Sequence, residues 1–239
     1  MTTQQLSYET DGVTFKGYYA APQHASRLAG VLVVPEAPGL GAHAKRRVDA
    51  LAQAGYAALG VDLHGEGALA ASPDQARAWV GDLKAHPARL IARLDAALRA
   101  LSDRPEVDAG RLAAAGYCFG GWCALELARA GRPLRSVTVF HGSLASARGA
   151  EAIAGSVLVC TGDSDPFVPI DQVLTFQAEM RAAGVDYEIC LYGGVRHGFT
   201  DAELQAPDPA FGYSPRGDAH SWASFMRELA EAVGGPACA

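Results

Sequence analysis

Six short apolar runs, separated by stretches with helical spacing, constrain the fold of this chain most strongly. The runs are rich in strand-forming residues and span 30–35, 56–61, 111–115, 136–140, 156–161 and 186–192. Apolar residues at helical intervals, with few breakers, occupy 42–54, 73–84, 87–101, 120–130, 171–183 and 218–233. Continuous apolar strands that alternate with helices are typical of a mostly parallel sheet covered on both faces. The sequence therefore predicts an α/β fold.

An antiparallel hairpin is expected ahead of this pattern. Residues 5–9 and 13–20 alternate apolar and polar side chains around Asp11-Gly12, a pair favoured in tight hairpin turns. The 239 residues are enough for one α/β domain and would make two small halves. We therefore expect a single domain over residues 1–239.

Composition excludes several classes of protein. With 49% hydrophobic and 19% charged residues the chain is too apolar for a disordered protein. Its net charge of −6 and scattered basic residues argue against nucleic-acid and membrane-surface partners. The N-terminus lacks the pattern of a signal peptide, and no apolar run approaches the ~20 residues that cross a bilayer, so we expect a cytoplasmic protein.

The five cysteines are an odd, sparse set, which argues against a disulfide scaffold. They show no Cys/His spacing of the zinc-site kind, so no metal is expected.

The most informative segment is GYCFGG at residues 116–121, between a predicted strand and a predicted helix. A sharp turn that exposes a nucleophile needs small residues two before and two after it, and Gly116 and Gly120 meet that need. Cys118 would then sit at a helix N-terminus, where the dipole favours a thiolate. For the hexapeptide alone, a buried structural cysteine is an equally good reading.

Two later segments favour catalysis. In enzymes that carry a nucleophile in such a strand-turn-helix, an acid and then a histidine follow the nucleophile along the chain, each after a strand. GDSDPFVP at 162–169 supplies the acid, with Asp165 preferred and Asp163 as the alternative. GGVRHGF at 193–199 supplies His197 as the general base. His141 also follows a predicted strand, but a structural role is preferred for it.

Glu36 follows the first long apolar run and precedes Ala37. A carboxylate beside the nucleophile elbow, the sharp turn at residues 116–121, has poor access to water. A chemical role for Glu36 is therefore favoured over that of a solvated loop acid. Glu36 could accept the thiol proton, or repel the thiolate and keep the thiol protonated.

Together, Glu36 in PEAPG, the elbow GYCFGG, GDSDPFVP and GGVRHGF resemble the dienelactone hydrolase family of α/β-hydrolases over nearly the whole chain. The resemblance implies an open sheet of about eight strands and a triad of Cys118, His197 and Asp165, assisted by Glu36. It also implies that the resting thiol pairs with the glutamate, and that substrate redirects it toward histidine.

One departure concerns substrate. The resemblance implies two arginines that grip a substrate carboxylate, but Asp201 occupies the position of one, and Arg77 is a loose candidate for the other. Because Asp201 would repel an anion, we expect neutral esters or lactones to be preferred.

The sequence thus predicts hydrolysis of a small-molecule ester, lactone or thioester through an acyl-cysteine, with no cofactor. The backbone N–H groups of Phe119 and Ala37 are expected to stabilise the oxyanion. The alternative is a non-catalytic or redox-sensing protein that uses the Cys118 thiol on the same fold.

Overall fold

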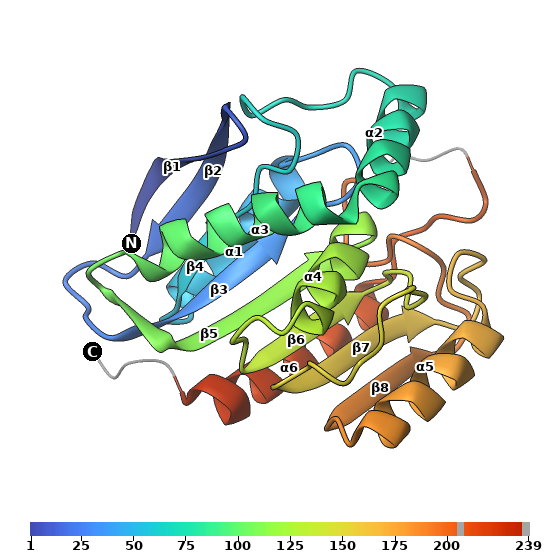
Figure 1. The fold of residues 1–239 in the computed structure, drawn as a ribbon. Helices are drawn as coiled ribbons and strands as arrows, with labels where there is room; N and C mark the ends of the chain where they lie inside the picture. Colours follow the sequence, from blue (N-terminus) through green and yellow to red (C-terminus); the bar gives the residue numbers. More distant parts are fainter. Residues whose placement is uncertain (205–207, 236–239) are drawn as a thin grey trace.

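An eight-stranded sheet forms the centre of the computed structural model, which describes residues 1–204 and 208–235. The strands lie in the order β1-β2-β4-β3-β5-β6-β7-β8 (Figure 1). They are β1 (Thr2–Thr10), β2 (Val13–Ala21), β3 (Leu28–Val34), β4 (Ala57–Gly60), β5 (Val107–Tyr117), β6 (Ser136–Phe140), β7 (Ser156–Gly162) and β8 (Tyr187–Tyr192). The pairs β1–β2 and β2–β4 are antiparallel, and the pairs from β4–β3 to β7–β8 are parallel. The predicted α/β fold is confirmed.

The helices cover both faces of the sheet. They are α1 (Ala42–Gln53), α2 (Pro73–Ala85), α3 (Pro87–Ser102), α4 (Phe119–Arg129), α5 (Ile170–Ala183) and α6 (Pro215–Val233). Buried residues of α3, α4 and α5 belong to one core cluster, and those of α1 and α6 to the other. Figure 1 shows α3, α4 and α5 in front of the sheet and α6 behind it. Each core is therefore sealed between one sheet face and its own helices.

The N-terminal hairpin also forms as predicted. Asp11 and Gly12 both have positive φ, 53° and 72°. Positive φ at both central residues is typical of a type I′ turn, whose twist matches that of the paired strands. At the other end of the chain, α6 begins at Pro215 rather than at Asp218. The Ser214 side chain accepts a hydrogen bond from the Gly217 N–H, and proline fits the first helical position, so the helix starts earlier than its apolar pattern indicates.

None of the helices in the described part of the chain combines the length and apolar character needed to cross a membrane. Cys238 and Pro207 lie outside the described residues.

The parallel part of the sheet positions the candidate site. The strands β3, β5, β7 and β8 point the same way, so the segments that follow their carboxyl ends meet at one edge. Those segments carry Glu36, Cys118, Asp165 and His197 respectively.

Candidate active site

Cys118 lies in the sharp turn between β5 and α4. Its backbone has φ 55° and ψ −120°, a conformation that L-residues rarely adopt. A Cβ at Gly116 would lie 2.0 Å from the carbonyl oxygen of Gly120, and one at Gly120 would lie 2.2 Å from that of Val34. Both positions therefore require glycine, and the local structure has the geometry of a nucleophile elbow.

Asp165, and not Asp163, lies against the candidate base. Its Oδ2 is 2.8 Å from Nδ1 of His197, and both side chains are nearly fully buried. The other oxygen of Asp165 accepts a hydrogen bond from the backbone N–H of Phe167 at 2.8 Å. Asp163 instead accepts from the N–H of Gly194 at 2.7 Å and is exposed. Of the two acids that the sequence left open, the structure brings Asp165 to the histidine.

Electrostatics at this site favour a protonated histidine. Burial by itself lowers the pKa of His197, but hydrogen bonds with Asp165 and Cys118, and the charges of both groups, raise it to about 10. A His197 imidazolium is therefore stable at neutral pH when it faces a Cys118 thiolate and the Asp165 carboxylate.

His141 holds the elbow in place. Its Nδ1 accepts a hydrogen bond from the backbone N–H of Cys118 at 3.2 Å, so Nε2 carries the proton and donates to Thr200 Oγ1 at 2.9 Å. Burial, then the charge of His197, places the pKa of His141 well below its ordinary value. A neutral histidine thus connects the nucleophile turn to the loop of the candidate base, in keeping with the structural role expected for it.

Glu36 is bound by a histidine that the sequence analysis did not select. Its Oε1 pairs with Nδ1 of the buried His43, seven residues later. Arg47 Nε donates to His43 Nε2 at 3.2 Å, so Nδ1 of His43 must carry the proton and donate to Glu36. Arg47 is held in turn by Thr200 O at 2.7 Å and by the Asp218 carboxylate. The resemblance implies a resting pair of Glu36 and thiol; in the structure, Oε1 of this carboxylate is engaged by His43.

His43 and Arg47 are four residues apart on one predicted helix, and this spacing places them on one face. The spacing was the one sequence feature that pointed to a contact between these two side chains. Charge alone gave no reason to connect that face with Glu36.

The two predicted substrate-binding residues are both occupied by partners. Asp201 Oδ1 accepts a hydrogen bond from Arg46 at 2.9 Å, so it does not stand as a free negative charge. Arg46 also lies 2.8 Å from Glu203. Arg77 is exposed on α2 and pairs with Asp74 of the same helix. Within the described residues no hydrogen bond or ion pair joins Arg77 to Cys118, Asp165 or His197, so the structure does not bring it into the candidate site.

The loop after β3 lies against the start of α4, as the close approach of Val34 to Gly120 shows. Phe119 is the first residue of α4, and a helix does not use the N–H of its first residue. Ala37 is held from its carbonyl side by His64 Nε2 at 3.2 Å. Both candidate oxyanion donors therefore belong to segments fixed beside Cys118.

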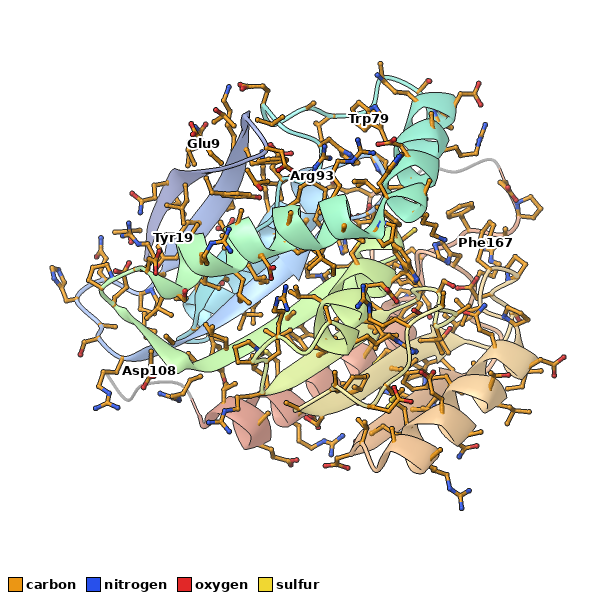
Figure 2. All side chains as sticks on the ribbon, in the orientation of Figure 1. Glu9, Tyr19, Trp79, Arg93, Asp108 and Phe167 are labelled. Atoms are coloured by element: carbon orange, nitrogen blue, oxygen red, sulfur yellow. The ribbon has the colours of Figure 1, made fainter. Side chains whose placement is uncertain are left out.

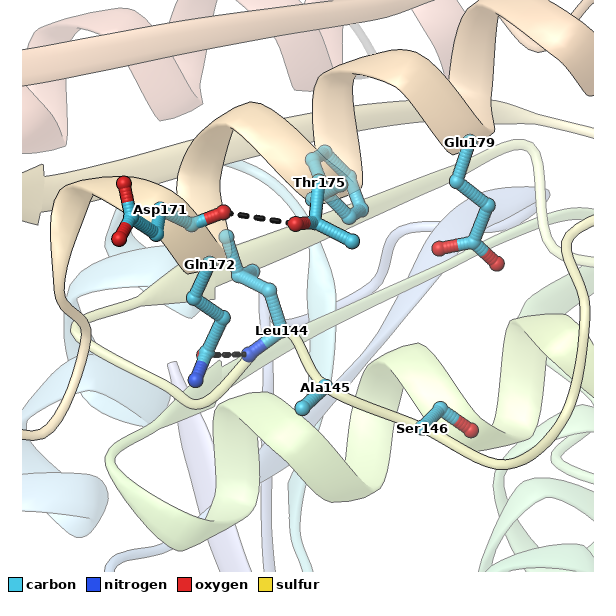
Figure 3. A pocket seen from close by; sticks show the side chains of 8 residues that line it. Leu144, Ala145, Ser146, Asp171, Gln172, Thr175 and Glu179 are labelled. Carbon is cyan, nitrogen blue, oxygen red and sulfur yellow. Dashed lines mark hydrogen bonds between the residues drawn. The ribbon is translucent and has the colours of Figure 1, made fainter.

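A separate surface pocket of about 310 Å³ lies between α5 and the loop after β6 (Figure 3). Its lining consists of Leu144, Ala145, Ser146, Asp171, Gln172, Thr175, Phe176 and Glu179. None of Cys118, Asp165 and His197 lines it, and its Gln172 accepts a hydrogen bond from the N–H of Leu144 at 2.6 Å. We therefore build the chemistry on the elbow and not on this pocket.

Comparison with known proteins identifies the family of this chain. The profile of the dienelactone hydrolase family matches residues 15–233. The chain belongs to this family. The solved structure of a dienelactone hydrolase-like promiscuous phosphotriesterase, P91 from metagenomic libraries, is 34% identical with a TM-score of 0.93 and covers 98% of this chain and 99% of its own. The protein m3DLH is 38% identical, also with a TM-score of 0.93, over 97% and 98% of the two chains.

A curated relative from Bradyrhizobium sp, named "Probable 2-oxo-3-(5-oxofuran-2-ylidene)propanoate lactonase", is 30% identical over 209 residues, which is 80% of this chain and 81% of its own. Several other curated relatives are named as carboxymethylenebutenolidases. This dienelactone hydrolase family member is thus a hydrolase that acts on ester or lactone bonds of a small molecule.

Proposed function

We propose that this family member hydrolyses its ester, lactone or thioester substrate through an acyl-cysteine formed on Cys118. The 2.8 Å hydrogen bond between His197 and Asp165, at the sheet edge that also carries the elbow, supports the proposal most directly. A purely redox-sensing thiol would need no acid and no histidine in register with it.

The proton of the Cys118 thiol passes to Nε2 of His197 before attack, and Asp165 holds Nδ1 and stabilises the imidazolium that faces the thiolate. The thiolate attacks the carbonyl carbon, and the N–H groups of Phe119 and Ala37 stabilise the oxyanion. The tetrahedral intermediate collapses, and the imidazolium gives its proton to the leaving oxygen or sulfur. Water, deprotonated by His197, then hydrolyses the thioester bond to Cys118 and restores the thiol.

Glu36 has an electrostatic part in this scheme. His43 donates to its Oε1 and so holds the Glu36 side chain beside the elbow as an acceptor. A carboxylate there opposes a resting thiolate unless the His197 imidazolium balances it. We propose that the His197 imidazolium, by balancing the Glu36 carboxylate, allows Cys118 to react as the thiolate.

A trapped acyl-enzyme tests the mechanism. Mixing the protein with a slowly hydrolysed p-nitrophenyl ester and quenching in acid should give an intact mass increased by the acyl group, located on Cys118 by peptide mapping. Cys190 needs a control, because its hydrogen bond with Cys160 lowers the pKa of Cys190 to about 6 and makes it a second reactive thiol. The Cys190→Ser variant should keep the adduct on Cys118, whereas acylation that maps only to other residues would refute the proposal.

Substrate charge is expected to respond in opposite directions to two substitutions. Asp201→Asn removes one partner of Arg46, which should favour a carboxylate-bearing ester over its methyl ester, whereas Arg46→Gln uncovers Asp201 and should favour the methyl ester. A half-exposed pair of this kind changes kcat/KM by about twofold to fivefold. Paired kcat/KM measurements check this. Identical charge preference in both variants would place the pair too far from the substrate to matter.

A further inference from the structure

Phe167 is exposed beside the candidate base. Its side chain is 49% accessible, although phenylalanine is usually buried. Its ring centroid lies 4.9 Å from that of His197, with an interplanar angle of 74°. Figure 2 labels Phe167 at the margin of the molecule. An exposed aromatic ring in contact with a reacting imidazole is positioned to touch a substrate.

Phe211 extends the same surface. Its ring lies 5.5 Å from Phe167 and 5.2 Å from His197, and it is half-buried. The two residues that flank Phe211 bind the backbone of His197. The His197 N–H donates to Ala210 O, and the His197 carbonyl accepts from the Gly212 N–H, each at 3.0 Å. We call Phe167 and Phe211 the aromatic platform.

The aromatic platform is also fixed to the acid. The backbone N–H of Phe167 donates to Oδ1 of Asp165, whose other oxygen holds His197. Phe167 is therefore positioned by the same carboxylate that orients the imidazole, and its ring keeps a defined place relative to the reacting atoms.

The position of the aromatic platform identifies the part of the substrate that it meets. The carbonyl oxygen points to the N–H groups of Phe119 and Ala37, whereas the leaving group must lie within reach of the His197 proton. Because Phe167 and Phe211 border the His197 ring, they border the leaving group and not the oxyanion.

We propose that the aromatic platform is a subsite for a planar, unsaturated ring in the leaving group of the substrate. This inference rests on the proposed hydrolysis at Cys118. A planar ring can stack on Phe167 and meet Phe211 edge to face, gaining quadrupole contacts in addition to buried area. A saturated ring of equal size gains the area alone, so the aromatic platform distinguishes the two.

Benzyl acetate and cyclohexylmethyl acetate form a matched pair of probes, since their acyl groups, ring sizes and primary alcohol leaving groups correspond. We expect the wild-type kcat/KM to favour the benzyl ester by about fivefold to tenfold. Phe167→Leu, which keeps an apolar cover over His197, should reduce this ratio to about twofold or less. Leu191→Ala is the control for loss of an exposed apolar side chain, because Leu191 is 45% exposed and lies on β8 rather than in the segments that carry Phe167 and Phe211; its ratio should equal that of the wild type.

A wild-type ratio near one, or an equal loss on both esters in Phe167→Leu, would overturn the subsite and leave Phe167 as a shield of His197. If neither ester is hydrolysed, the failure belongs to the proposed function. The subsite is then tested by ligand-observed NMR, using both esters with the wild-type protein and with Phe167→Leu. Equal binding of the two esters by the wild type would overturn it, and preferential binding of the benzyl ester that Phe167→Leu removes would support it.

Discussion

Replacing Cys118 with alanine should lower kcat/KM for ester hydrolysis by about a thousandfold or more. Under the proposed mechanism, alanine removes the atom that forms the acyl bond, while the proposed oxyanion donors and His197 remain. The fold should persist, because Cys118 already has a φ of 55° and alanine adds no bulk to that turn. Initial rates on p-nitrophenyl acetate, with circular dichroism as the check of folding, measure the effect.

Cys190→Ser provides the control for a general loss of thiols. It removes a half-buried cysteine whose pKa is lowered to about 6 by its hydrogen bond with Cys160, and it should retain most of the wild-type rate. A folded Cys118→Ala protein that keeps a tenth of the wild-type kcat/KM would show that another group is the nucleophile.

Asp165→Asn should cost about a thousandfold to ten-thousandfold in kcat. An amide nitrogen facing Nδ1 of His197 would turn that atom into an acceptor and put the proton on Nε2, which could then no longer take the thiol proton. The carboxylate also helps to raise the pKa of His197 to about 10, so the substitution should lower that pKa, as NMR titration of the imidazole can show.

Asp163→Asn is the matched substitution two residues away. Its Oδ1 accepts from the Gly194 N–H at 2.7 Å, a bond that asparagine can retain, so we expect less than a tenfold loss. Equal or reversed losses in the two folded variants would transfer the role of the acid to Asp163.

Interactions close in the sequence were predictable. Gly116 and Gly120 are needed because backbone atoms approach within 2.2 Å of where their Cβ atoms would be, and that demand is visible in the spacing around Cys118. The alternation of apolar runs with helices is similarly local, and it fixes which segments follow the carboxyl ends of the strands. The order of the candidate nucleophile, acid and histidine along the chain was therefore readable from the sequence.

The choice of partners came from elsewhere in the chain. Asp163 and Asp165 share one loop, and only the packing of β7 beside β8 decides which carboxylate meets the histidine 32 residues later. The charge predicted for Asp201 is offset by Arg46, 155 residues distant, and no local pattern connects the two.

The sequence by itself determined the α/β fold and the glycine turn around Cys118, because strand periodicity and turn sterics depend on neighbouring residues. The tertiary structure alone decided that Glu36 faces His43, that Asp201 pairs with Arg46, and that Phe167 remains exposed against His197. Hydrogen bonds, ion pairs and ring contacts act over only a few ångströms, so they depend on which segments the completed fold brings together.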